Sequence, residues 1–176
     1  MRRAAEKNLI LIGMPGAGKS TIGPRLARAL SFPFLDTDSL IEERYGRKLQ
    51  EIIDLEGLEA FCSKEEETLL SLKVSAHVIA TGGSVVYGDR GMARLRDLGW
   101  IVWLDLPLAQ LKKRLKGGAE GRGIVRFRRQ SLSDLYHQRR PLYERYAQLR
   151  VEVAGKTDEE VVREILDRLA ATRKGS

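Results

Sequence analysis

The sequence predicts a three-layer α/β fold, in which helices cover both faces of a central five-stranded parallel sheet. Short apolar segments alternate with longer helical ones along the chain, which is the order expected of a parallel sheet. The 176 residues are 43% hydrophobic and 31% charged, as in ordinary globular proteins, and their number fits one domain. Because no repeat and no linker rich in Pro, Gly or Ser interrupts the pattern, we expect a single domain over residues 1–176.

The first half of the chain alternates two strands with four helices. A short apolar run leads into a glycine-rich turn, after which Ile22, Leu26 and Leu30 fall on one helical face. A second short strand ends on an acidic residue, and Asp38 or Ser39 is the expected N-cap of the helix that follows. The predicted elements are strands at 8–13 and 34–36 and helices at 19–30, 39–45, 48–56 and 58–73.

The second half continues the alternation with three strands. The first of these is broken by Gly82 and Gly83, and the next ends on Asp105. The predicted elements are strands at 77–81, 100–105 and 150–153 and helices at 89–98, 108–115, 132–147 and 158–171. Residues 117–130 are rich in Gly and Arg, follow neither periodicity, and are predicted to form a lid.

The formal net charge of +7 is concentrated in one region. Between residues 110 and 150, twelve Lys and Arg face three acidic residues. Such a region indicates an anionic partner, either nucleic acid or a nucleotide together with an acidic metabolite. Lys112, Lys113 and Lys116 are interpreted equally well as the solvent-facing side of a helix. Few aromatic residues are interleaved with the basic ones to stack on bases, which argues against nucleic acid.

Composition also bears on the compartment. No uncharged apolar run approaches the roughly 20 residues of a membrane span, so we expect no membrane partner. The N-terminal residues lead into a strand without the apolar segment of a signal peptide. The single cysteine, Cys62, cannot form an internal disulfide. We therefore expect a cytoplasmic monomer or small homo-oligomer.

A phosphate-binding loop is the most specific motif. Residues 13–20, Gly-Met-Pro-Gly-Ala-Gly-Lys-Ser, match G-x-x-x-x-G-K-[ST] between a predicted strand and a predicted helix. Glycines let backbone N–H groups turn inward around phosphate oxygens, and the start of the helix adds partial positive charge. Lys19 can reach the terminal phosphates, and the Ser20 hydroxyl can sit on Mg²⁺. The predicted ATP-binding residues are Gly13, Gly16, Ala17, Gly18, Lys19, Ser20 and Thr21.

Size and motif content favour a small-molecule kinase among nucleotide-binding proteins. The base-specificity motif N-K-x-D of GTPases is absent, and a motor ATPase needs a longer chain. An arginine-rich loop can close over the phosphates and exclude water as a competing acceptor. An ATP-binding regulatory or nucleic-acid-associated module that uses the basic region is the alternative from another class.

Six segments carry a resemblance to a known family over about residues 9–169. They are the phosphate loop 13–20, the run 34–38 with Ile41-Glu42, Phe61 with Glu65, the run 80–83, the loop around Arg122, and Arg139-Arg140-Pro141-Leu142-Tyr143. In their order and spacing they resemble shikimate kinases, within the nucleoside-monophosphate-kinase-like P-loop fold. The resemblance implies transfer of the γ-phosphoryl group of ATP, with Mg²⁺, to a small acidic metabolite: shikimate, giving shikimate 3-phosphate.

The resemblance also implies roles for individual residues. Asp36 matches the acid that holds the magnesium's water shell, although Asp105, at the end of another strand, is an alternative. Asp38 matches the acid that binds the acceptor's hydroxyls and activates one of them. Lys19, Asp38 and Arg122 are the implied catalytic residues, and Arg114 is an implied contact of the adenine or a solvent-facing residue. The implied substrate-binding residues are Asp38, Glu65, Gly82, Gly83, Arg139 and Arg140.

The chain departs from the family pattern in three places. The lid sequence after Arg122 is Gly-Ile-Val in place of Pro-Leu-Leu, and Ser84 stands in place of a glycine. Cys62 replaces the arginine that grips the acceptor's carboxylate and neutralises the glutamate at the position of Glu65. Three alternatives are then open for the carboxylate of Glu65. It pairs with a lid arginine, Arg126 or Arg128; it pairs with an ammonium group of the acceptor; or it is solvated at the surface. The second describes a hydroxy amino acid such as homoserine, which, with other hydroxy acids, is the alternative acceptor.

Overall fold

The chain forms one five-stranded parallel sheet. The computed structural model describes residues 7–116 and 130–174. The strands are β1 (Asn8–Ile12), β2 (Phe34–Asp36), β3 (Val78–Ala80), β4 (Gly99–Asp105) and β5 (Leu149–Glu152). Their spatial order is β2-β3-β1-β4-β5, and every neighbouring pair is parallel, so the predicted sheet is confirmed.

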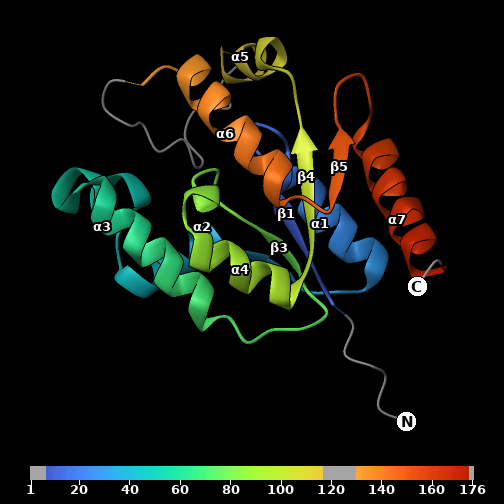
Figure 1. Ribbon diagram of the computed structural model, residues 1–176, viewed down its shortest axis with the longest axis horizontal. Coiled ribbons are helices and arrows are strands. Elements are labelled where there is room, and N and C mark those ends of the chain that lie inside the picture. The colour runs from blue at the N-terminus through green and yellow to red at the C-terminus, as the bar shows by residue number, and fades with distance from the viewer. Residues whose placement is uncertain (1–6, 117–129, 175–176) are drawn as a thin grey trace.

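Helices lie on both sides of this sheet (Figure 1). Helix α1 packs on β1, β2 and β3 and against α7, whereas α4 and α6 pack on β4, and α3 packs against α4. The arrangement is the three-layer fold that the sequence predicts. The helices are α1 (Lys19–Leu30), α2 (Thr37–Tyr45), α3 (Leu49–Ser71), α4 (Asp89–Leu98), α5 (Leu108–Lys116), α6 (Leu132–Tyr146) and α7 (Asp158–Lys174), with a 3₁₀ turn η1 (Val85–Tyr87).

The core lies on both faces of the central strands. All five residues of β1 and all three of β3 are buried, which explains why these strands read as continuous apolar runs. Trp103 of β4 stacks on Tyr143 of α6 with 6.0 Å between ring centroids. Burial of each such side chain contributes on the order of 1.5–3 kcal/mol, and these contacts hold α6 against the sheet.

Most predicted boundaries agree with the structure within two residues, but α7 ends at Lys174, three residues later than predicted. Three further differences concern the joining, capping and existence of elements. The predicted helices 48–56 and 58–73 are joined in α3, but Gly57 has a non-helical, left-handed backbone (φ 88°) that kinks it. The N-cap of α2 is Asp36, not Asp38 or Ser39, because its carboxylate accepts from both of their N–H groups. The turn η1 was not expected. The predicted lid, residues 117–130, lies outside the described residues except for Gln130.

The parallel sheet brings three loops together at one edge. The register pairs Asp36 with Ala80 and Leu11 with Ala80, so β1, β2 and β3 end side by side. The loops that follow them begin at Gly13, Thr37 and Thr81. Ligand sites of open α/β sheets form at such carboxyl ends, and the candidate site is built there.

In the described parts of the chain, every helix is too short or too polar to cross a lipid bilayer.

Candidate active site

The phosphate loop connects β1 to α1 in a conformation that glycine permits. Gly16 and Gly18 have φ of 81° and 109°, in the left-handed region that other residues avoid. Gly18 caps α1 without a side-chain hydrogen bond, so no side chain blocks the N–H groups of the first turn. These groups and the positive end of the helix make an anion-binding surface.

Lys19 is held at the centre of this loop. Its side chain is buried, and the ammonium donates to the carbonyl oxygens of Gly13 at 2.6 Å and Met14 at 2.8 Å. Burial lowers the pKa of Lys19 to about 8, although the nearby carboxylates of Asp38 and Asp36 oppose the shift. An anion bound in the loop would stabilise the charged form.

A cavity of about 720 Å³ opens beside Lys19. It is large enough for a nucleotide and a small acceptor. The structure brings most of the sequence-predicted site residues to its wall: Gly16, Gly18, Lys19, Ser20, Thr21, Asp36, Asp38, Gly82, Gly83 and Arg114. Gly13 and Ala17 lie within the same loop, and Ala17 is fully buried.

Two oxygen donors on the cavity wall suit Mg²⁺. The Ser20 hydroxyl begins α1, and the Asp36 carboxylate ends β2. Among the described residues, no group of three His, Cys, Asp or Glu could hold a metal ion without further ligands. Mg²⁺ takes one or two protein oxygens and completes its shell with water and phosphate oxygens. Ser20 and Asp36 therefore fit this ion together with a bound nucleotide.

Asp38 borders the cavity, and its Oδ1 is buried against the turn at Gly82. In the described part of the chain, its Oδ1 is buried without a hydrogen-bond partner. Burial and the charge of Asp36 raise the pKa of Asp38 to about 6, against the opposing effect of Lys19. A buried acceptor without a partner is costly. Above pH 6 this group can accept a proton.

The turn after β3 leaves room for these side chains because it lacks its own. A Cβ on Gly82 would lie 2.8 Å from Oδ1 of Asp38 and 2.9 Å from Oε1 of Glu65. A Cβ on Gly83 would lie 2.7 Å from Nη1 of Arg139 and 2.9 Å from Pro15. The backbone of the turn thus lies against two carboxyls on one side and a guanidinium on the other.

Glu65 is buried, so a solvated position at the surface is wrong. It is 4% exposed, and its two carboxyl oxygens lie 3.1 and 3.0 Å from Oγ of Ser84. Burial, then the neighbouring Asp38, raise the pKa of Glu65 to about 8, while Ser84 and Arg139 lower it. Arg126 and Arg128, the candidate lid partners, lie outside the described residues.

The adjacent arginines of α6 face different surroundings. Arg139 is 2% exposed, donates from Nε to the Tyr87 hydroxyl at 3.2 Å, and lies beside Gly83. Arg140 instead faces Asp105 and the ring of Trp103. The structure therefore brings Arg139, and not Arg140, to the turn at Gly83.

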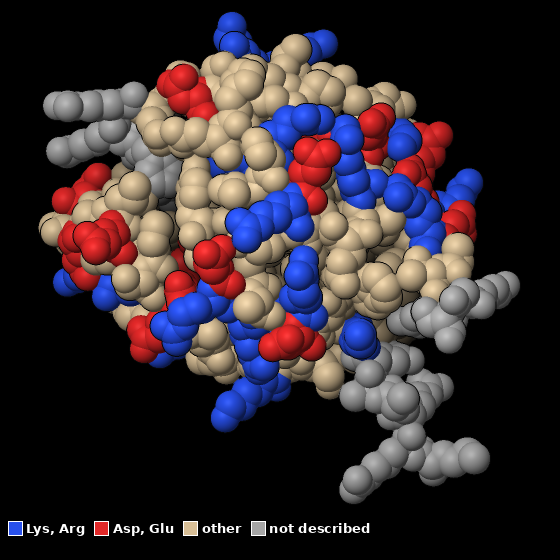
Figure 2. All heavy atoms as spheres, in the orientation of Figure 1, with Lys and Arg blue, Asp and Glu red and all other residues tan. Residues whose placement is uncertain are grey.

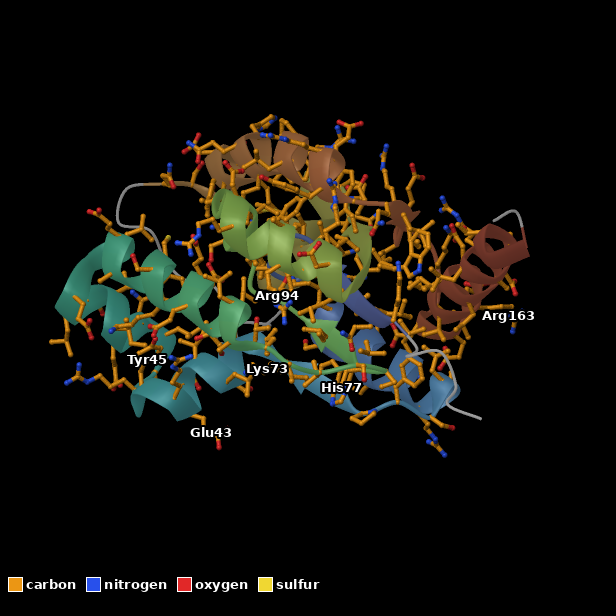
Figure 3. The ribbon with its side chains drawn as sticks, turned by 60° about the horizontal axis from the view of Figure 1, so that its bottom comes forward. Glu43, Tyr45, Lys73, His77, Arg94 and Arg163 are labelled. Atoms are coloured by element: carbon orange, nitrogen blue, oxygen red, sulfur yellow. The ribbon has the colours of Figure 1, made fainter. Side chains whose placement is uncertain are left out.

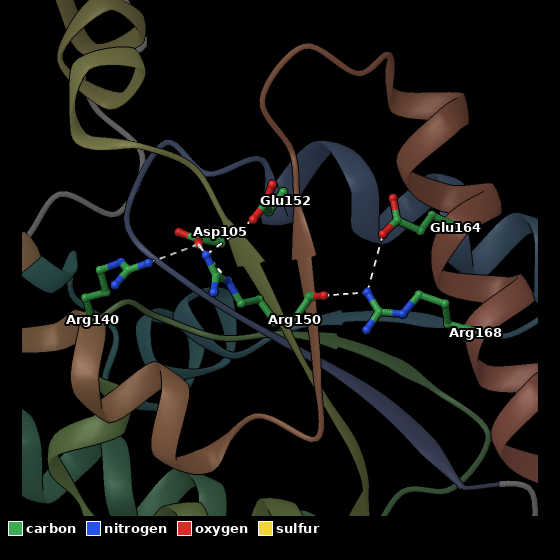
Figure 4. Close-up of polar contacts among 6 residues, drawn as sticks. All are labelled: Asp105, Arg140, Arg150, Glu152, Glu164 and Arg168. Atoms are coloured by element: carbon green, nitrogen blue, oxygen red, sulfur yellow. Dashed lines mark hydrogen bonds and ion pairs between the residues drawn. The ribbon is translucent and has the colours of Figure 1, made fainter.

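Asp105 lies in a separate cluster of ion pairs (Figure 4). Its Oδ2 lies 2.7 Å from Nη2 of Arg150 and 3.7 Å from Nη2 of Arg140. Arg168 of α7 in turn donates to the carbonyl oxygen of Arg150 at 2.6 Å. Because two arginines neutralise its charge, Asp105 is less suited than Asp36 to a metal.

Of the remaining expected residues, some lie near the phosphate loop or on α5, and one lies outside the described residues. Arg114 donates from Nη1 to the Gly16 carbonyl oxygen at 3.0 Å, which joins α5 to the phosphate loop. Arg122 lies outside the described residues. Lys112, Lys113 and Lys116 are exposed, in agreement with the solvent-facing interpretation. On the face seen in Figure 2, basic side chains are interspersed with acidic ones.

Sequence reasoning missed two contacts of the site. The Tyr143 hydroxyl donates to the Gly83 carbonyl oxygen at 2.7 Å, and Ser84 bonds Glu65. The spacing of four residues between Arg139 and Tyr143 could have placed both on one helical face. His77, seen in Figure 3, precedes β3 and lies at the opposite edge of the sheet from the site.

Comparisons with known proteins agree on one family. A family model described as shikimate kinase matches residues 15–170. The chain is 40% identical over 162 residues to a shikimate kinase of Geobacter sulfurreducens, covering 90% of this chain and 88% of the relative. It is 33% identical over 164 residues to one of Persephonella marina, covering 93% and 99%. A solved shikimate kinase from Acinetobacter baumannii, in complex with shikimate, has a TM-score of 0.84 at 30% identity, covering 95% and 94%.

Proposed function

The chain belongs to the shikimate kinase family, and on that premise we propose that it phosphorylates shikimate with ATP. The γ-phosphoryl group moves to a hydroxyl of shikimate, and ADP and shikimate 3-phosphate leave. The observation that carries the proposal is the placement of Lys19, Asp38 and Arg139 around the turn at Gly82 and Gly83. These groups suit a phosphate, a reacting hydroxyl and a carboxylate.

The nucleotide end of the cavity is the phosphate loop. Backbone N–H groups and the Lys19 ammonium bind the β- and γ-phosphates, and Arg114 borders the loop from α5. Ser20 and Asp36 would hold Mg²⁺, which would neutralise charge on the phosphate oxygens. The catalytic effect is positioning and charge stabilisation, because phosphoryl transfer needs little covalent chemistry from the protein.

Asp38 activates the acceptor hydroxyl. Its carboxylate, at the wall of the cavity, accepts the hydrogen bond of that hydroxyl and takes the proton as the new P–O bond forms. The raised pKa of Asp38, about 6, leaves it ionised at neutral pH, yet basic enough to receive a proton. Arg122, in the predicted lid, stabilises the negative charge that develops on the transferring phosphoryl group.

Arg139 binds the carboxylate of shikimate. Its guanidinium is buried beside Gly83, where a planar fork can bind a carboxylate with two parallel bonds. A cytoplasmic location and a monomeric or small homo-oligomeric state stay predictions of the sequence.

The neighbouring arginines of α6 give a matched test. Arg139→Gln should raise the KM for shikimate by about 10-fold or more, because an ionic hydrogen bond to the carboxylate is lost. The KM for ATP should change far less. Arg140→Gln removes the same charge from the same helix but contacts Asp105, and should change the KM for shikimate less than about threefold. Equal effects of the two substitutions would contradict the assignment of Arg139.

A further inference from the structure

Glu65 and Ser84 form a buried pair that the phosphotransfer mechanism does not use. Both side chains are 4% exposed, and the Ser84 hydroxyl is within 3.1 Å of both carboxyl oxygens. A hydroxyl carries one proton, so it satisfies one of these oxygens at a time. An ionised carboxylate at this depth needs more compensation than one neutral donor supplies.

The surroundings of Glu65 favour its neutral form. Asp38 approaches from α2 on the same side of Gly82, and two nearby carboxyls disfavour a second negative charge. Arg139, from α6, is the nearby cation, and its Nε bonds the hydroxyl of Tyr87 from η1. The other groups that face Glu65 are the Tyr143 hydroxyl of α6 and the Cys62 thiol of α3, both without charge in their protonated forms.

Cys62, Glu65 and Ser84 all border a second cavity. This cavity has a volume of about 180 Å³ and is bordered by Cys62, Glu65, Ser84 and Tyr87. Glu65 therefore borders this second cavity and lies against the turn at Gly82, and the Ser84 hydroxyl fixes the orientation of its carboxyl group.

We propose that Ser84 is a positioning residue that holds Glu65 as a neutral carboxylic acid, whose O–H donates to a hydroxyl of the acceptor beside Gly82. The proposal rests on the proposed function and deepens it. Asp38, ionised, accepts from the reacting hydroxyl, while Glu65, neutral, donates to a second one. The site then selects an acceptor with at least two hydroxyls and a carboxylate, as shikimate has, over a hydroxy amino acid whose ammonium would need an anionic Glu65.

Stability at alkaline pH gives a readout that needs no substrate. The pKa of Glu65 is raised from 4.5 to about 8, so between these values the folded state holds a proton that the unfolded state releases. The stability contribution of Glu65 is therefore present below pH 4.5 and is lost as the pH rises through 8. Glutamine imitates the neutral acid and does not ionise.

The first experiment compares the melting temperatures of Glu65→Gln and the unmodified protein. We expect the melting temperature of the variant, relative to the parent, to rise by about 3 °C or more between about pH 6.5 and about pH 9. Lys19 titrates in both proteins, so its effect cancels. The matched control is Glu66→Gln, whose carboxylate pairs with Arg90 and should give no such rise. If the difference in melting temperature between Glu65→Gln and the parent is the same at both pH values, Glu65 is not neutral in the folded protein.

The second experiment tests the contact with the acceptor and the role of Ser84. We expect Ser84→Ala to raise the KM for shikimate by about fivefold or more with a smaller change in kcat, and Ser84→Thr to restore it. The readout is kcat/KM for shikimate at saturating ATP, where the bound phosphates keep Lys19 charged. Because the Ser84 hydroxyl lowers the pKa of Glu65, the alkaline loss of this kcat/KM should move to higher pH in Ser84→Ala and disappear in Glu65→Gln.

Two results would overturn the donor role. One is an unchanged KM for shikimate in Ser84→Ala; the other is the same alkaline loss of kcat/KM in Glu65→Gln as in the parent. A parent that releases no ADP with shikimate would instead contradict the proposed function. The donor role would fall with it, while the melting comparison would still decide the protonation of Glu65.

Discussion

Replacement of Lys19 by alanine should lower kcat for ATP-dependent phosphorylation by at least about 100-fold. Single electrostatic groups aimed at the developing charge are worth about 10²–10³ in kcat, and Lys19 is the lysine at the centre of the phosphate loop. Its buried ammonium already lies at the carbonyl oxygens of Gly13 and Met14. The measurement is ADP release at saturating ATP and acceptor, together with a melting curve that shows the variant is folded.

Lys48→Ala is the matched control for this substitution. Lys48 also borders the cavity, but its side chain is 75% exposed and its ammonium pairs with Glu42. A surface ion pair of this kind contributes little, so kcat should stay within about threefold of the parent. If the kcat of Lys19→Ala stays within about tenfold of that of the parent, the loop at residues 13–20 does not bind the phosphates of ATP as proposed.

Replacement of Asp38 by asparagine should lower kcat by about 100-fold to 10,000-fold. Asparagine keeps the shape of the side chain but cannot accept the proton of the attacking hydroxyl. The Asp38 carboxyl group lies beside Gly82, near Lys19, and its Oδ1 is buried without a hydrogen-bond partner. Among the described residues, no other carboxyl group lies close to both Lys19 and this turn in the same way. The KM for ATP should change by less than about threefold, because the phosphates are bound elsewhere.

Glu43→Gln removes a carboxylate from the same helix as the control. Glu43 is exposed on the outer side of α2 (Figure 3) and should leave kcat unchanged within about twofold. If Asp38→Asn raises the KM for shikimate while kcat stays near that of the parent, Asp38 only binds the acceptor and another group takes its proton.

The sheet and the phosphate loop could be predicted from the sequence because their signals are local. Strands buried on both faces appear as unbroken apolar runs, and the glycine spacing of residues 13–20 determines a loop conformation without distant partners. Gly57 likewise separated two predicted helices, and α3 kinks at this residue, which has a positive φ. The cap of α2 was misassigned because Asp36, Asp38 and Ser39 are adjacent and all are good caps.

The roles of neighbouring or distant side chains could not be predicted in the same way. Arg139 and Arg140 are alike in sequence, and only the position of Asp105 on β4 separates their surroundings. Glu65 and Ser84 lie 19 residues apart on elements whose contact depends on how α3 packs beside η1. The sequence indicated that Glu65 lacked its usual partner, and the structure supplies a serine hydroxyl in that place.

Acceptor-dependent ADP release by the unmodified chain tests most directly whether shikimate is phosphorylated at this site. The assay takes Mg·ATP with shikimate, homoserine, gluconate or a nucleoside monophosphate as the acceptor. We predict ADP release that depends on shikimate and produces shikimate 3-phosphate, with little release for the other three. Release with homoserine and not with shikimate would contradict this acceptor. Binding of single-stranded nucleic acid with a steep salt dependence, and no release with any acceptor, would identify a regulatory or nucleic-acid-associated module instead.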